Sequence, residues 1–196
     1  MDITPIFRRS TLLSLAFIST LLVGCGGSDG PKSEILILSV GEKPEVCAGR
    51  QINLNFICLP AAYLSSTDEF EVDSRYIQGF TPEFGVSYEL RVQKDPFEYQ
   101  ISDPPYADYT LLETLTEVQV AQVGDTYAYD IPLDGYMFNV EDGNYFLGEQ
   151  HFNYQFNCGE GVDCQQLVDM DGSGSLVTIE LTYVGGEVPI TLTYWN

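Results

Sequence analysis

The segment that decides the fold is His151-Phe152-Asn153-Tyr154-Gln155-Phe156-Asn157-Cys158. Polar and apolar side chains alternate along it, so its three aromatic residues and Cys158 share one face. Successive side chains of a β-strand point to opposite faces of a sheet, and strict alternation is typical of a strand with one buried face. The segment therefore predicts a strand with an aromatic core face.

Similar patterns lie on both sides of this segment. Val177, Ile179, Leu181 and Tyr183 alternate with polar residues, and 185–187 is a predicted turn into a strand at 188–195. Further strands are predicted at 35–40, 51–59, 88–92 and 109–120. Residues 60–68 are the best candidate for a short helix or loop. The predicted fold is mainly β (all-β, or α+β with little helix), in small antiparallel sheet or barrel-like modules stapled by disulfides.

The charge of the chain is strongly negative and unevenly distributed. Its 196 residues carry 29 Asp and Glu but only eight Lys and Arg, a formal net charge of −21. Every basic residue lies at or before Lys94, and the stretch from Asp95 to Asn196 holds 18 of the acids. Affinity for nucleic acid comes largely from Lys and Arg that neutralise phosphates, so nucleic acid is excluded as a partner. Docking to an anionic membrane through side chains is disfavoured for the same reason.

The N-terminal segment predicts export and lipid anchoring. Arg8 and Arg9 precede an apolar run, 12–23, that has the length of a signal-peptide core and is short for a membrane span. The run ends in Leu22-Val23-Gly24-Cys25, which resembles the lipobox of bacterial lipoproteins. The resemblance implies removal of residues 1–24, attachment of acyl chains such as palmitate to Cys25, and anchoring in the cell envelope. Residue 26 is Gly rather than Asp, which favours the outer membrane in a cell with two membranes.

Four further cysteines form two local pairs. Two disulfides, Cys47–Cys58 and Cys158–Cys164, are the natural interpretation in an oxidising, exported location, among three connectivities that four cysteines allow. A zinc site is the alternative, but the chain has no Cys-x-x-Cys spacing and a single histidine, His151.

The middle of the chain resembles the DUF4377 domain. The resemblance rests on Cys47, on Cys58-Leu59, and on three longer segments, 76–80, 83–92 and 104–115, in this order. It covers less than half of the chain. Members occur in bacterial lipoproteins, sometimes beside META domains, and have no established function, so no catalytic residue is implied. The expected organisation is a signal peptide (1–24), a flexible Gly-rich tether (25–34), a DUF4377-like domain (35–120) and an acidic β-rich module (121–196).

A twelve-residue stretch, Asp169 to Glu180, matches the calcium loop of an EF-hand in register. The ligand positions would be filled by Asp169, Asp171, Ser173, the carbonyl of Ser175, and Glu180 as a bidentate carboxylate. The alternative is a polar hairpin turn between strands at 165–170 and 176–184. The second of these is rich in β-branched residues, and in such a strand Glu180 points to solvent.

Aromatic clusters are the remaining candidates for binding. Tyr76, Phe80 and Tyr88 would line a ligand pocket or pack in the core, and core packing is favoured. A second group of aromatic residues would face a sugar or peptide, or form one buried face of a sheet. The mostly even spacing of the group favours the buried face. Its members are Tyr127, Tyr129, Tyr136, Phe138 and Tyr145.

The leading functional expectation is an envelope lipoprotein with a non-catalytic binding or structural role, whose protein or small-molecule ligand the sequence does not identify. One alternative is a calcium-dependent surface module. Another is a small hydrolase that uses paired carboxylates. No cofactor is expected other than calcium.

Overall fold

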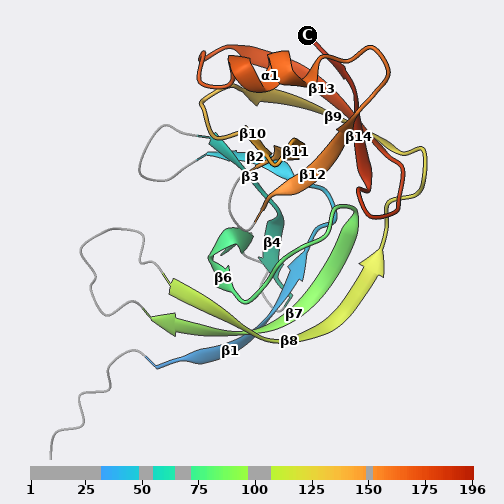
Figure 1. Cartoon of the computed structure of the whole chain (residues 1–196). Coiled ribbons are helices and arrows are strands. Elements are labelled where there is room, and N and C mark those ends of the chain that lie inside the picture. The colour runs from blue at the N-terminus through green and yellow to red at the C-terminus, as the bar shows by residue number, and fades with distance from the viewer. Residues whose placement is uncertain (1–31, 49–54, 65–71, 97–106, 149–151) are drawn as a thin grey trace, which may run out of the picture. The chain divides into compact units, whose positions relative to one another are not determined.

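β-Strands dominate the structure, as predicted. The computed structural model describes residues 32–48, 55–64, 72–96, 107–148 and 152–196. In this part of the chain the strands build two six-stranded sheets and one separate two-stranded sheet. The helices described there are α1 (Cys164–Met170) and a 3-10 turn, η1 (Ser74–Tyr76). Figure 1 shows the strands that form the two larger sheets. None of the described helices has the length and apolarity needed to cross a bilayer.

The first sheet is built by residues 34–119. Its spatial order is β5 (Val72–Asp73), β4 (Pro60–Tyr63), β1 (Glu34–Val40), β7 (Val86–Pro96), β8 (Ala107–Gln119) and β6 (Ile77–Gln78). The long strands β7 and β8 are neighbours toward one end of this order and pair antiparallel over their whole length, with two register shifts. Tyr88, Leu90 and Val92 of β7 are all buried and lie opposite Val40, Leu38 and Leu36 of β1. This is the alternation that the sequence predicts.

The second sheet is built by residues 126–195. Its order is β10 (Phe138–Glu141), β11 (Asn144–Leu147), β12 (Tyr154–Cys158), β14 (Ile190–Trp195), β13 (Leu176–Tyr183) and β9 (Thr126–Pro132). Phe152, Tyr154 and Phe156 are buried, which confirms the predicted aromatic face of β12. The four alternating apolar residues of β13 are buried as well. The pairing of β12 with β14 is parallel, and the other pairings are antiparallel.

The third sheet has two strands. Its strands β2 (Glu45–Ala48) and β3 (Asn55–Cys58) are joined by a disulfide between Cys47 and Cys58. Asn55 of β3 is bonded to the segment between β9 and β10. Its backbone N–H and its side-chain amide both donate to Oδ2 of Asp134, at 3.1 and 2.7 Å. Phe56, Ile57 and Cys58 are all buried, so β3 has no solvent face, unlike the predicted half-buried strand.

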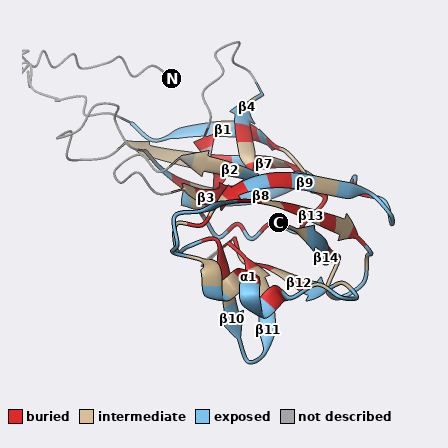
Figure 2. Ribbon diagram, turned by 90° about the horizontal axis from the view of Figure 1, so that it is seen from above, coloured by how far each residue is buried: buried red, intermediate tan, exposed pale blue. Residues whose placement is uncertain are grey.

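One hydrophobic cluster contains buried side chains from both large sheets. Buried residues lie where the sheets face each other in Figure 2. Phe84, just before β7, makes edge-to-face contacts with Tyr127 of β9 and Tyr154 of β12, at 5.1 and 5.7 Å between ring centroids. Contacts group all residues from Pro31 to Asn196 into one compact unit. The assignment of 35–120 and 121–196 to separate domains stays a prediction.

Two local predictions are wrong. Residues 60–63, expected in a helix or loop, form strand β4, because they pair with both β1 and β5. Pro60 is the first residue of that strand, a position at which its missing N–H is tolerated. Residues 165–170, expected in a strand, belong to helix α1. Asp163 caps this helix by accepting a 2.9 Å hydrogen bond from the backbone N–H of Gln166, and Cys164 and Leu167 are buried at helical spacing.

Candidate functional site

Asp171 is the third residue of the stretch that resembles an EF-hand calcium loop. Its carboxylate accepts hydrogen bonds from four backbone N–H groups. Its Oδ1 accepts hydrogen bonds from the N–H groups of Gly135 (2.8 Å) and Gly172 (3.0 Å). Its Oδ2 accepts from Met137 (2.8 Å) and Phe138 (2.9 Å). A carboxylate offers about four lone-pair directions, so these bonds occupy its accepting capacity. Asp171 therefore locks the end of α1 onto the segment that leads into β10.

The other four predicted ligands have separate partners or positions. Asp169 lies in α1 and accepts from the side-chain amide of Gln165 at 2.8 Å. Ser173 Oγ accepts from the backbone N–H of Ser175 at 3.2 Å, which closes a local turn. The carbonyl of Ser175 accepts from the N–H of Leu133 at 2.8 Å. Glu180 lies in β13, and its Oε1 accepts from Thr193 of β14 at 3.3 Å.

The arrangement is that of a structural turn. Within the described ranges, no three His, Cys, Asp or Glu side chains are grouped so as to hold one metal ion. A helix does precede the loop, as in an EF-hand, but the segment that follows is the strand β13, as its β-branched residues predict. Calcium binding stays a prediction. To coordinate calcium, Asp171 would have to give up hydrogen bonds to backbone donors.

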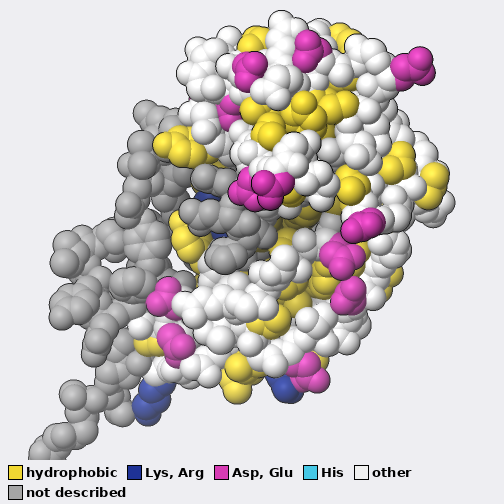
Figure 3. Space-filling model, viewed as in Figure 1, with side chains coloured by type: hydrophobic (Ala, Val, Ile, Leu, Met, Phe, Trp, Pro, Cys, Tyr) yellow, Lys and Arg dark blue, Asp and Glu magenta, His cyan; other side chains and the backbone are white. Residues whose placement is uncertain are grey.

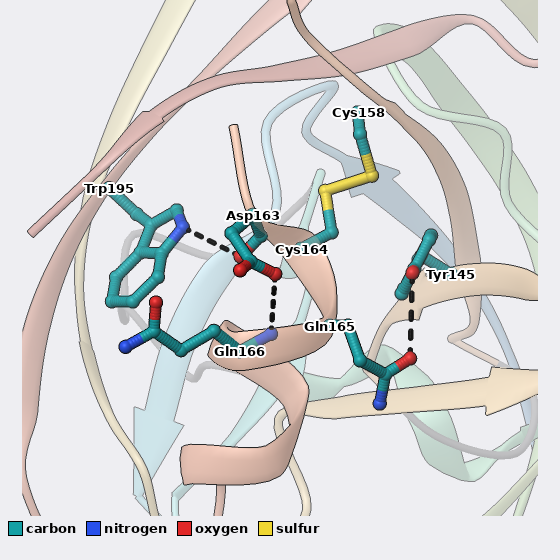
Figure 4. Close-up of a disulfide and its surroundings, with 7 residues drawn as sticks. All are labelled: Tyr145, Cys158, Asp163, Cys164, Gln165, Gln166 and Trp195. Atoms are coloured by element: carbon teal, nitrogen blue, oxygen red, sulfur yellow. Dashed lines mark hydrogen bonds between the residues drawn. A yellow bond between two sulfur atoms is a disulfide. The ribbon is translucent and has the colours of Figure 1, made fainter. Parts of the chain in front are cut away.

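The loop leads back through α1 to the second disulfide, which is shown with its surroundings in Figure 4. Cys158 at the end of β12 and Cys164 at the start of α1 are bonded, with their Cα atoms 6.1 Å apart. The indole N–H of Trp195 donates to the carbonyl of Asp163 at 3.1 Å. The helix is thus attached to β12 by the disulfide and to β14 by a hydrogen bond. Both predicted disulfides are confirmed.

Tyrosines line the contact between the two sheets. Tyr129 and Tyr154 are 7% and 6% exposed, and their hydroxyl groups have no hydrogen-bond partner among the residues that the structure describes. The ring of Tyr129 also lies under the ammonium of Lys43, 5.4 Å from the ring centroid. Burial raises the pKa of both phenols well above its ordinary value, because an ionised phenolate loses its hydration there.

The hydroxyl of Tyr88, unlike those of Tyr129 and Tyr154, has a hydrogen-bond partner among the described residues. Tyr88 accepts a 2.8 Å hydrogen bond from the backbone N–H of Glu83. Burial raises the pKa of its hydroxyl, and this bond acts in the opposite direction. Tyr88 also packs edge-to-face on Phe80, with 5.1 Å between ring centroids, whereas Tyr76 is exposed. The three aromatic residues Tyr76, Phe80 and Tyr88 therefore do not converge, and two of them pack in the core.

The second aromatic group is divided in the same way. Tyr129 and Phe138 are buried, Tyr127 and Tyr145 are half-buried, and Tyr136 is exposed. Tyr145 stacks on Phe156 of the core, and its hydroxyl lies within 3.5 Å of the Gln165 side chain. Packing therefore accounts for most of this group, as its spacing predicts.

Two predicted residues lie outside the described part of the chain. These are Cys25, the expected lipid attachment point, and His151. The expected signal peptide and residues 51–54, 65–68 and 104–106 of the predicted segments also lie outside it.

Sequence reasoning missed the structural role of two aspartates. The sequence pattern suggests Asp171 as a metal ligand and does not mark Asp134, yet each accepts a hydrogen bond from a backbone N–H of a distant segment. Each stands beside a glycine in a turn-like stretch, which was the available local signal. Their partners, however, are set by tertiary packing.

Comparisons with known proteins identify no relative. No family model, no curated protein and no solved structure matches the chain. The resemblance to the DUF4377 domain stays a prediction, and the functional argument rests on the residues themselves.

Proposed function

We propose that this chain is a lipid-anchored bacterial envelope lipoprotein with a non-catalytic binding or structural role. The observation that carries the proposal is Leu22-Val23-Gly24-Cys25 at the end of an apolar run that follows Arg8 and Arg9. A short apolar core after basic residues is typical of a secretory signal, and the cysteine at its end is where a lipoprotein receives its acyl chains. Gly26 favours the outer membrane as the destination.

The disulfides support an exported location. Two local cysteine pairs lie at a separation that suits a disulfide, with Cα atoms 6.0 and 6.1 Å apart. Structural disulfides persist in oxidising compartments and are rare in the reducing cytosol. One bridge cross-links the short strands β2 and β3, and the other attaches helix α1 to β12.

The surface chemistry supports a solvated, non-catalytic module. Acidic side chains are spread over the face shown in Figure 3 rather than gathered in one place. The carboxylates singled out for chemistry, those of Asp171 and Glu180, hold backbone or neighbouring side-chain groups. Such contacts are those of a scaffold, and the strong negative charge keeps it soluble and apart from anionic headgroups.

The test is acyl labelling of the full-length chain in a bacterium with two membranes. Radiolabelled palmitate is expected to enter the wild-type chain and the control variant Ser28→Ala, and not Cys25→Ser. Wild-type chain should sediment with outer-membrane vesicles, whereas Gly26→Asp should move it to the inner membrane. Palmitate in Cys25→Ser, or none in the wild type, would overturn the proposed anchor.

A further inference from the structure

Among the residues that the structure describes, one edge of strand β8 is largely open. Its first edge pairs with β7 from Ala107 to Gln119. Its second edge pairs with β6 only at Tyr109 and Thr110. Within the described segments no other backbone bonds to residues 111–119 on that side. Backbone N–H and C=O groups of this stretch therefore point away from the sheet, as on other edge strands, with their alternation interrupted where the register against β7 shifts.

The open edge carries apolar side chains at its irregular positions. Two register shifts against β7 each leave one extra residue in β8: Leu112 between the partners of Val92 and Arg91, and Leu115 between those of Leu90 and Glu89. Their side chains are 44% and 39% exposed, and Val118 further along is 54% exposed. Bulges re-aim side chains locally, and both bulges here expose leucine. Edges that must stay unpaired typically carry Lys, Pro, other charged residues or bulges; this stretch has two bulges and two Glu, but neither Lys nor Pro.

The charge of the edge indicates what kind of strand fits. Its acids are Glu113 and Glu117, and no Lys or Arg follows Lys94 in the chain. Glu113 forms an ion pair with Arg91 of β7. The negative charge of the edge is therefore concentrated near Glu117. A second copy would bring the same acids, and an antiparallel pairing centred on Leu115 would set Glu113 opposite Glu117. Like charges directly opposite each other disfavour that pairing, whereas Lys or Arg would complement it.

We propose that residues 111–119 of β8 bind an extended segment of another protein, in which apolar residues alternate with Lys or Arg, by addition of a strand. Main-chain hydrogen bonds to the open edge supply affinity, contacts with Leu112, Leu115 and Val118 supply apolar area, and Glu117 selects positive charge. The inference specifies the partner in the binding role proposed above and rests on that role, but not on the lipid anchor.

The test uses synthetic ten-residue peptides and the full-length chain in a non-ionic detergent. The first peptide alternates Val and Lys, the second alternates Val and Glu, and the third is the Val–Lys peptide methylated at alternate backbone nitrogens. Binding is measured by fluorescence anisotropy, and amide hydrogen exchange is followed along β8. We expect the first peptide to bind and to slow exchange at residues 111–119. The other two should bind at least tenfold more weakly.

Variants separate this edge from general charge attraction. Val118→Lys places a positive charge on the edge and is expected to weaken binding of the Val–Lys peptide at least tenfold. Val140→Lys, an exposed residue on β10 at the edge of the other sheet, is the matched control and should leave the dissociation constant within twofold. Equal binding of the methylated peptide, or equal effects of the two variants, would overturn the proposal.

Two further outcomes bear on the partner. A dimer that forms without peptide and is abolished by Val118→Lys would identify a second copy as the occupant and overturn the proposed one. Palmitate labelling of Cys25 is read independently, so loss of the anchor and loss of peptide binding are distinguishable.

Discussion

Asp171 Oδ2 accepts a 2.8 Å hydrogen bond from the backbone N–H of Met137, a residue 34 positions earlier in the chain. With its other three backbone donors, this bond makes a single carboxylate the junction between α1, the loop before β13 and the segment that enters β10. A residue that local pattern suggests as a metal ligand thus serves the fold.

Replacement of this carboxylate should destabilise the protein. Asp171→Asn keeps the size but turns an NH₂ group toward backbone N–H donors, which leaves some of them unpaired. The free energy of unfolding in urea is expected to fall by about 1–3 kcal/mol. Asp169→Asn is the control, because the bond that Asp169 makes is to Gln165 on its own helix, and it should change stability by less than about 0.5 kcal/mol. Equal losses in the two variants would contradict the role of Asp171.

Calcium is expected to stabilise the protein no more than another divalent cation does. The melting temperature in CaCl₂ should equal that in MgCl₂ at the same concentration, because Asp171 is occupied and Glu180 is bonded to Thr193. A rise specific to calcium that Asp169→Asn removes would instead establish the calcium loop predicted from the sequence.

Monovalent salt should stabilise the protein. The formal charge of −21 repels itself in the compact state, and screening weakens this repulsion. An increase from low salt to about 0.5 M NaCl, where the screening length falls to a few ångström, is expected to raise the melting temperature by about 2–4 °C, which corresponds to roughly 1 kcal/mol. A melting temperature that does not change with NaCl would show that the acids are too far apart to matter.

The buried phenols should make stability fall in alkali. Tyr129 and Tyr154 have raised pKa values when folded, so their full contribution is present below the unfolded-state pKa of about 10. Above that pH the unfolded chain releases protons that the folded chain retains, and stability declines. Urea denaturation at pH 8 and pH 11 should show this decline.

Removal of the two hydroxyls tests the same residues. Tyr154→Phe and Tyr129→Phe delete groups without hydrogen-bond partners among the described residues, so stability at pH 8 is expected to rise by about 1 kcal/mol. The decline between pH 8 and pH 11 should become smaller. Tyr136→Phe, at an exposed position, should leave both quantities unchanged. A loss of stability in Tyr154→Phe would reveal a partner for its hydroxyl.

The two disulfides should contribute similar amounts to the free energy of unfolding. The double variants Cys47→Ala/Cys58→Ala and Cys158→Ala/Cys164→Ala are expected to lose about 2–3 kcal/mol each, because each bridge closes a short loop. Reduction of the wild type should lower the urea midpoint by the combined amount. If reduction leaves the midpoint unchanged, the bridges do not restrain the unfolded chain.

The strands that the sequence predicts well are those whose signal is local. Alternation places the buried side chains correctly at 152–156 and 177–183, since the period of two follows from backbone geometry alone. Cys158, predicted on the same face as Phe156, is exposed. The two disulfides are predictable because their partners lie 11 and 6 residues apart. Strand β4 and helix α1 were not predicted. The first forms by pairing with β1 and β5, and the second is a short helix that depends on its cap and its disulfide.

By itself, then, the sequence determined the β class, the cysteine pairing and the charge. Only the tertiary structure decided that Asp171 holds Met137 and that Asn55 is bonded to Asp134. It also decided that residues 111–119 of β8, with two exposed leucines, have no second strand partner among the described residues. The physical reason is sequence separation. Side-chain alternation is a property of neighbouring residues, whereas hydrogen bonds and edges depend on which distant segments the folded core brings together.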